Sequence, residues 1–176
     1  MTYQNYTSAD TSINNVKLPA AITKYPPEIG ESVCDYGCGK YTEHIRAQLS
    51  DTVCEYFPFD PYNQTTTVNN AARRYGCTFG YNRIYMCNVL NVIDSEDAIK
   101  DALHRAFAWL NVGGKLIIQI YEGNKSGVGR VTKNDCYQRN EKTAVYIKYF
   151  ADAFYSMKNY AHERHGNVLI VTKKGV

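Results

Sequence analysis

The spacing of apolar and polar residues along the chain predicts strands that alternate with helices. Short runs rich in β-branched and aromatic residues favour strands, which we expect over residues 32–36, 53–59, 84–93 and 115–121. Apolar residues recur at helical spacing around Ile45 and Leu49, and over residues 95–110 and 142–154. Such alternation is typical of a mostly parallel sheet with helices on both faces.

The remaining segments complete this pattern. Residues 1–30 are polar, carry a modest helical pattern and end near two prolines, so we expect a lid or brace there. Residues 157–160 and 167–172 predict a closing hairpin, whereas residues 62–82 contain only a weak helical hint. The predicted fold class is α/β, with a Rossmann-like, mostly parallel sheet, helices on both faces and an antiparallel edge hairpin.

Composition limits the class of protein. The chain has 176 residues, of which 44% are hydrophobic and 21% charged. These values predict a single domain over residues 1–176 and exclude a disordered or collagen-like chain. No apolar run approaches the roughly 18 residues that a membrane helix needs, and the first residues carry no secretory signal. We therefore expect a cytoplasmic protein that does not bind membranes and keeps its six cysteines reduced.

Basic residues are unevenly distributed. The formal net charge of the chain is +3, whereas residues 124–148 hold six lysines and arginines against two acids, which is six minus two, or +4. A basic segment of this kind either contacts phosphates or forms a solvated loop. Charge therefore leaves both nucleic acid and small molecules open as binding partners.

The turn after the first strand carries the main signal for chemistry. Asp35-Tyr36-Gly37-Cys38-Gly39 places two glycines where a strand passes into a helix, which allows a tight turn and close approach of a ligand to the backbone. Asp60 ends the next strand, where a carboxylate can accept both hydroxyls of a ribose. Together these features predict an adenosine-type cofactor. Thr42 stands where a nicotinamide site would favour a third glycine.

Four ordered motifs resemble class I S-adenosylmethionine-dependent methyltransferases. They are the glycine turn at residues 35–39, Phe59-Asp60-Pro61, the segment from Asn88 to Ile93, and the segment from Leu110 to Ile118. Their order and spacing follow the family over roughly residues 30–172. The resemblance implies a minimal class I methyltransferase fold with S-adenosyl-L-methionine as the cofactor.

A narrower resemblance involves two further groups of residues. Thr11-Ser12-Ile13 with Lys17-Leu18-Pro19, and residues 128–133 with Tyr137-Gln138, are similar to a bacterial group of methyltransferases associated with DNA phosphorothioation. This second resemblance implies no particular substrate.

The family pattern, carried over by position, implies a set of cofactor-binding residues. Gly37 and Gly39 would lie under the methionine and ribose part of the cofactor, Asp35 near its ammonium group and Asp60 on its ribose hydroxyls. The other implied contacts are Tyr62 over the adenine, and Cys87 and Asn88 beside the methionine part.

The sequence departs from the family pattern in how adenine would be recognised. No Asp or Glu lies between Asp60 and Asp94, although many relatives use an acid in that interval to accept the adenine amino group. Recognition would then use an amide such as Asn69 or Asn70, a backbone carbonyl, or no such contact.

Residues beyond the later strands are candidates for the acceptor site. Methyl transfer depends mainly on alignment of the reacting atoms, so a base is optional. The catalytic candidates are Asn91, Tyr121, Glu122 and Arg130. The chain lacks the proline-rich motif of amino-methylating DNA enzymes, and none of its cysteines follows a proline as in C5-methylating ones. The acceptor therefore stays open between a small molecule and nucleic acid.

Three functions agree with these signals. The first is a methyltransferase acting on an unidentified acceptor, with compounds related to nucleic acid among the candidates. The second is a non-catalytic protein that binds S-adenosylmethionine, and the third is an enzyme that cleaves it without an acceptor. Cys34, Cys38 and His44 lack a fourth ligand at metal-site spacing, so no metal is expected. The sequence does not predict an oligomeric state.

Overall fold

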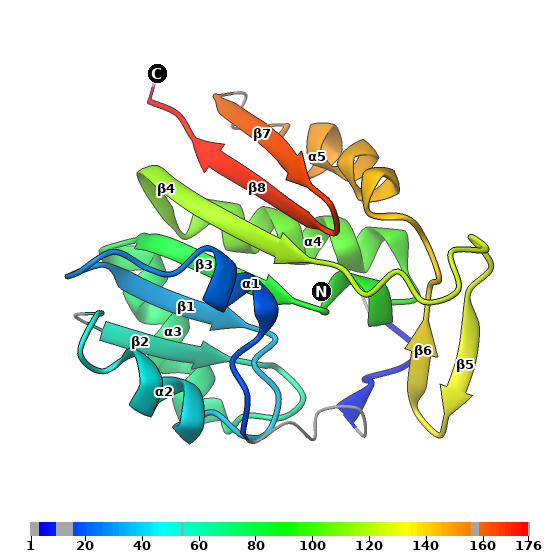
Figure 1. The fold of residues 1–176 in the computed structure, drawn as a ribbon, viewed down its shortest axis with the longest axis horizontal. Coiled ribbons are helices and arrows are strands. Elements are labelled where there is room, and N and C mark those ends of the chain that lie inside the picture. Colours follow the sequence, from blue (N-terminus) through cyan, green and yellow to red (C-terminus); the bar gives the residue numbers. More distant parts are fainter. Residues whose placement is uncertain (1–3, 10–15, 54, 156–158, 176) are drawn as a thin grey trace.

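The central feature of the structure is a six-stranded sheet with strand order β2-β1-β3-β4-β8-β7 (Figure 1). The computed structural model describes residues 4–9, 16–53, 55–155 and 159–175. The strands of the sheet are β1 (Ser32–Tyr36), β2 (Glu55–Phe59), β3 (Tyr81–Cys87), β4 (Leu110–Gln119), β7 (Tyr160–His165) and β8 (Val168–Lys173). The first four run parallel, and β8 and β7 pair antiparallel at one edge. The predicted fold class is therefore confirmed.

Helices cover both faces of the sheet. One face carries α1 (Ala20–Lys24) and α2 (Glu43–Leu49), and the other carries α3 (Thr66–Thr78), α4 (Glu96–Ala108) and α5 (Lys148–Ala153). Successive side chains of a strand point to opposite faces. Ile84 and Met86 of β3 therefore join the core with α4, whereas Tyr85 joins the core with α1 and α2. Burial on both faces explains why apolar residues follow one another directly within these parallel strands, as in Ile84-Tyr85-Met86 of β3 and Leu116-Ile117-Ile118 of β4.

The edge strand β2 and helix α3 contain residues that are unusual for buried strands and helices. Pro58 is tolerated within β2 because this strand stands at the end of the strand order. Helix α3 forms in the segment where the sequence carries only a weak hint, and the side chain of Thr65 caps it by accepting from the N–H of Val68. The buried positions of α3 hold Asn69, Ala72 and Gly76. Such small or polar residues produce no apolar stripe in the sequence.

Strands β3 and β4 differ from their expected bounds. The expectation of a strand as far as Ile93 is wrong, because β3 ends at Cys87 and the chain continues into a 3₁₀ helix, η2 (Leu90–Val92). Asn88 has a left-handed φ of +60°, which ends the strand. Strand β4 begins at Leu110 and ends at Gln119, whereas the expected strand covered residues 115–121.

The segment after β4 contains a hairpin that the sequence analysis did not predict. Strands β5 (Arg130–Lys133) and β6 (Cys136–Gln138) form a separate two-stranded sheet. All four residues of β5 are exposed, so no alternation of apolar and polar residues marks this strand. The helix expected over residues 142–154 is divided into a 3₁₀ helix, η3 (Thr143–Ile147), and α5.

The closing hairpin at the end of the chain is confirmed, with a later first strand than expected. Its strands are β7 and β8, and β7 spans residues 160–165 instead of 157–160. Residues 156–158 lie outside the described part of the chain. Within that part, every helix is too short or too polar to cross a membrane.

Gly114 lies where β4 shifts register against β3. A Cβ atom at this position would lie 2.8 Å from the carbonyl oxygen of Tyr81 and 2.9 Å from that of Asn111. We expect Gly114→Ala to lower the free energy of unfolding by about 1–3 kcal/mol, because backbone atoms cannot move aside as a side chain can. Val112→Ala, at a position 68% exposed, should change it by less than about 0.5 kcal/mol. Urea denaturation that gave equal values for the two variants would contradict the expected overpacking.

Candidate functional site

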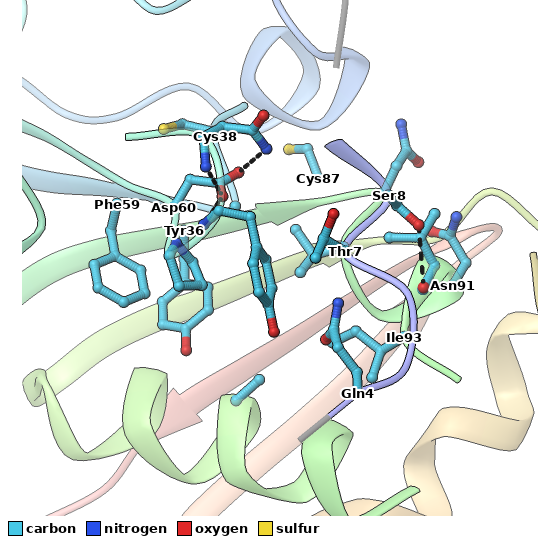
Figure 2. A pocket seen from close by; sticks show the side chains of 18 of the residues that line it. Gln4, Thr7, Ser8, Tyr36, Cys38, Phe59, Asp60, Cys87, Asn91 and Ile93 are labelled. Atoms are coloured by element: carbon cyan, nitrogen blue, oxygen red, sulfur yellow. Dashed lines mark hydrogen bonds between the residues drawn. The ribbon is translucent and has the colours of Figure 1, made fainter. Parts of the chain in front are cut away.

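A large cavity lies where the strand order reverses beside β1. The chain passes from β1 to β2 on one side and enters β3 on the other, and in such sheets ligands bind beyond the carboxyl ends of the strands at this point. The cavity has a volume of about 1160 Å³, compared with roughly 300–1,000 Å³ for a typical small-molecule site. Side chains of Asp60, Cys87 and Asn91 surround it (Figure 2). Its size is sufficient for two small ligands.

The turn after β1 requires glycine at position 37. Gly37 has a φ of +77°, and a Cβ atom there would lie 2.3 Å from Cγ2 of Val89. The Gly37 N–H also donates to the carbonyl of Phe59 at 2.6 Å. The turn is therefore fixed between the end of β2 and the loop that follows β3.

Asp60 holds the same turn from the end of β2. Its carboxylate accepts from the N–H of Gly39 at 3.0 Å, from the N–H groups of Tyr62 and Asn63 at 2.9 Å each, and from Nδ2 of Asn63 at 3.2 Å. An ionised carboxylate has roughly four lone-pair positions, so these donors fill it. Asp60 lies in the cavity as expected, and a ribose hydroxyl can reach its carboxylate only if one of these donors leaves.

Asn69 clamps the backbone of Asp60. Its Oδ1 accepts from the N–H of Asp60 at 2.9 Å, and its Nδ2 donates to the carbonyl of Asp60 at 2.9 Å and to that of Gln64 at 3.2 Å. Both ends of the amide are thereby used within the protein. Asn69 and Asn70, the two amides expected near adenine, both line the cavity, and Asn70 is the exposed one.

Asp35 is the most deeply buried acid of the site. It is 2% exposed, and the hydroxyl of Tyr56 donates to its Oδ2 at 3.0 Å. Burial raises the pKa of Asp35 to about 7, against the opposing effect of the Tyr56 hydrogen bond, and the nearby charge of Asp60 raises it further. Asp35 therefore carries only part of a negative charge at neutral pH.

Of the other expected cofactor-binding residues, Gly37, Tyr62, Cys87 and Asn88 also line the cavity, whereas Gly39 is buried and is not among the lining residues. Burial raises the pKa of the Cys87 thiol, which therefore stays protonated. Asn88 accepts from Nε2 of Gln119 at 3.3 Å, and Oε1 of Gln119 accepts from the N–H of Ala21 at 2.7 Å. Helix α1 thus braces the end of β3 through one glutamine.

Asn91 and Gln138 form a closed ring of hydrogen bonds with the backbone of Tyr121. The N–H of Tyr121 donates to Oδ1 of Asn91 at 3.3 Å, Nδ2 of Asn91 donates to Oε1 of Gln138 at 3.2 Å, and Nε2 of Gln138 donates to the carbonyl of Tyr121 at 3.1 Å. Both amides are at least nine-tenths buried and line the cavity. Each amide keeps a second N–H that the ring does not use.

The remaining catalytic candidates separate into two groups. Tyr121 and Arg130 are exposed and line the cavity. Glu122 is not among the lining residues, and its carboxylate accepts from the N–H and the hydroxyl of Thr143 at 2.7 Å each. These hydrogen bonds, with the nearby ammonium of Lys125, hold the pKa of Glu122 below its usual value. The structure therefore brings Asn91, Tyr121 and Arg130 to one cavity and leaves Glu122 outside it.

The N-terminal segment lies against the β5–β6 hairpin beside the cavity (Figure 1). The carboxylate of Asp135, at the hairpin turn, accepts from the N–H and the hydroxyl of Thr7, and its carbonyl accepts from the N–H of Ser8 at 2.7 Å. The ring of Tyr6 stacks on that of Tyr137, with centroids 5.7 Å apart. Because Thr7 and Ser8 also line the cavity, this segment is part of the cavity wall.

Sequence analysis missed lining residues that come from the helices. These are Arg73 on α3, and Asp101 and Arg105 on α4. Asp101 brings a carboxylate to the cavity. The sequence analysis looked for acids only between Asp60 and Asp94 and therefore did not consider it. In the sequence, Asp101 lies three residues after the buried Ala98 and four residues before Arg105. Helical spacing therefore places it at the edge of the buried face of α4.

Half of the cations in the basic segment 124–148 are engaged by acids. Three of its six cations form ion pairs, namely Lys125 with Glu122, Arg139 with Glu141, and Lys148 with Glu96. Arg139 is in addition only 8% exposed. The local excess of positive charge therefore gives little support to a nucleic-acid surface.

The described residues also bear on metal binding and on the state of the cysteines. Within residues 4–9, 16–53, 55–155 and 159–175, no group of three or more His, Cys, Asp and Glu could hold a metal ion. The cysteines of this part are free thiols. Thr11-Ser12-Ile13, which contributes to the narrower resemblance, lies outside the described residues.

Comparison with solved structures gives consistent matches to methyltransferases. A 1,6-didemethyltoxoflavin-N1-methyltransferase of Burkholderia thailandensis, solved with that compound and S-adenosylhomocysteine, is 15% identical; the match covers 84% of this chain and 72% of that chain with a TM-score of 0.57. A sugar N-methyltransferase of Streptoalloteichus is 9% identical, with coverages of 96% and 87% and a TM-score of 0.57. An S-adenosylmethionine-dependent methyltransferase of Clostridium acetobutylicum is 12% identical, with coverages of 96% and 92% and a TM-score of 0.57.

These likenesses, at low sequence identity, concern the fold. No protein-family model and no curated protein matches the sequence. The chain has the Rossmann-like fold of the class I S-adenosylmethionine-dependent methyltransferases.

The raised pKa of Asp35 predicts how stability depends on pH. Between about pH 4 and pH 7 the folded protein keeps a proton that an unfolded chain with the usual aspartate pKa of 3.8 has lost. The free energy of unfolding should therefore fall as pH rises through this range, by roughly 2–4 kcal/mol from this residue. Urea denaturation at a series of pH values should show that Asp35→Asn flattens the profile, whereas the exposed Asp51→Asn does not. An unchanged slope in Asp35→Asn would contradict the assignment.

Proposed function

We propose that the protein is an S-adenosylmethionine-dependent methyltransferase whose acceptor is a small molecule. The observation that carries the proposal is the single cavity of about 1160 Å³ at the switch point of the sheet. One part of it is built from the glycine turn and Asp60, and another from the Asn91–Gln138 ring. A methyltransferase needs two adjoining sites of this kind, because cofactor and acceptor must meet in line.

In this proposal the cofactor lies over the turn that follows β1. Gly37 approaches it through the backbone, Gly39 holds the carboxylate of Asp60 through its N–H, and Asp60 binds the ribose. The other cofactor contacts come from Asp35, Tyr62, Cys87 and Asn88. The donors and acceptors of this set suit an adenosine bearing an amino-acid chain, which agrees with the bound S-adenosylhomocysteine of one structural neighbour.

The acceptor in this proposal lies between η2 and the β5–β6 hairpin. When bound, the cofactor supplies a methyl group on a sulfonium sulfur. The buried amides of Asn91 and Gln138 would orient the acceptor, while Tyr121 and Arg130 would contact its outer side. Glu122 would not contact the acceptor. Its carboxylate would instead fix the loop after β4 by accepting hydrogen bonds from Thr143.

The walls of the cavity favour a small acceptor over a nucleic acid. The hairpin and the N-terminal segment are joined by hydrogen bonds at Asp135 and by the stacking of Tyr6 on Tyr137. A polymer would have to reach past this contact, and three of the six cations of segment 124–148 are engaged in ion pairs. Neither feature hinders a compact molecule that fits inside the cavity.

Calorimetry with S-adenosylmethionine and S-adenosylhomocysteine tests the cofactor site. We expect both to bind, and Asp60→Ala to weaken binding at least tenfold, or about 1.4 kcal/mol, because the ribose loses a charged acceptor. Asp51→Ala serves as the exposed control, and circular dichroism checks that both variants are folded. Absence of binding to the folded wild type at millimolar ligand would refute the proposed function.

Product analysis tests the reaction. With tritium-labelled S-adenosylmethionine and an extract of the encoding organism, we expect label in the small-molecule fraction and an equal amount of S-adenosylhomocysteine. Label in the nucleic-acid fraction would contradict the proposed acceptor class. Binding without any turnover would indicate a non-catalytic protein, and methylthioadenosine or homoserine formed without acceptor would indicate a cleaving enzyme.

A further inference from the structure

We propose that the side chain of Asn63 occupies the position of one ribose hydroxyl on Asp60, so that the cofactor displaces this amide and bonds Asp60 through a single hydroxyl. The inference rests on the proposed function, because it takes Asp60 as the ribose-binding residue. It makes Asn63 a residue that competes with the cofactor for Asp60 and thereby sets the affinity of the site.

Three of the four donors to Asp60 belong to the backbone and cannot leave. The N–H groups of Tyr62 and Asn63 both reach Oδ1, within a loop whose start is clamped by Asn69. The N–H of Gly39 reaches Oδ2 at 3.0 Å. The carbonyl of Gly39 is itself held by Nε2 of Gln64 at 2.6 Å. Releasing any of these donors would require the loop or the glycine turn to refold.

The fourth donor is a rotatable side chain. Nδ2 of Asn63 reaches Oδ2 of Asp60 at 3.2 Å, the longest of the four contacts. Rotation of the Asn63 side chain frees one position on Oδ2 and leaves Oδ1 with its two backbone donors. A hydroxyl donor can then replace the amide on Oδ2, whereas a second hydroxyl finds no free position on either oxygen.

A second observation indicates that the Asn63 side chain is poised to move. Its Oδ1 is buried and receives no hydrogen bond from any described residue. A buried acceptor without a donor is unfavourable, so this conformation of the amide satisfies its nitrogen and not its oxygen. Asn63 lines the cavity, and rotation would offer the unused oxygen to a ligand or to water.

The variant Asn63→Ala tests the competition. Alanine cannot occupy Oδ2 of Asp60, so we expect S-adenosylhomocysteine to bind about three- to tenfold more tightly to this variant than to wild type in calorimetry. A net hydrogen bond has a strength in this range. The control is Thr67→Ala, an exposed residue of α3 outside the cavity lining, which should bind as wild type does. Weaker or unchanged binding by a folded Asn63→Ala would overturn the inference.

A second measurement uses the wild-type protein and does not depend on a variant. The probes are the 2′-deoxy and 3′-deoxy analogues of S-adenosylhomocysteine. A single bonded hydroxyl predicts that one analogue binds at least tenfold more weakly than the parent and the other within threefold. Equal losses for both analogues, or no loss for either, would overturn the inference. In these outcomes the parent compound still binds, whereas failure of the proposed function would show as no binding of the parent at all.

Discussion

The site depends first on the hydrogen bonds that Asp60 makes at the end of β2. One carboxylate joins the turn after β1, through Gly39, to the loop before α3, through Tyr62 and Asn63. These two loops flank the point where the strand order reverses. Without this acceptor the N–H of the buried Gly39 would be unpaired, which is unfavourable, and the partly buried N–H groups of Tyr62 and Asn63 would lose their partner. The bonds of Asn69 to the backbone of Asp60 extend the same arrangement into α3. Helix α3 is therefore positioned by these polar contacts together with the packing of Ala72 and Tyr75 on the core.

The turn that Asp60 holds also determines the surroundings of Asp35 and the position of the loop after β3. Gly37 lies against Val89, so the loop after β3 is fixed against the turn after β1. This close approach leaves Asp35 behind the turn with Tyr56 as its hydrogen-bond partner, and burial then raises its pKa. Of the two acids beside the turn, Asp60 and not Asp35 therefore carries most of the negative charge. In the proposed function, the carboxylate that organises the loops is also the one that binds the ribose, so binding and local folding compete for the same lone pairs.

The sequence predicts those parts of the molecule that follow from local pattern. The strand at residues 32–36 and the cap of α4 by Ser95 are marked by apolar runs and by a serine before a helical repeat. The cavity position of Gly37 and Asp60 follows from the general rule for parallel sheets. Helix α3 and the β5–β6 hairpin are not marked, because α3 buries small and polar residues and β5 is fully exposed. The ring of Asn91 and Gln138, and the contact of Thr7 with Asp135, join residues far apart in the chain, which no single-sequence pattern encodes.

The chemistry open to the acceptor follows from which groups are left free around it. Asp135 is engaged by Thr7, Glu122 by Thr143, and the two buried amides by each other. The walls that η2 and the hairpin contribute therefore present amide and hydroxyl groups, and the charged side chain there is the exposed Arg130. Such walls can fix the orientation of a polar molecule, but they offer no carboxylate or imidazole to remove its proton. In the proposed reaction, an acceptor held against these walls would bring its own unshared electron pair, as an unprotonated nitrogen does, and would release any proton to water or to the Asp101 carboxylate or the His44 imidazole, which line other parts of the cavity. Alignment of the reacting atoms would then supply the larger share of the rate.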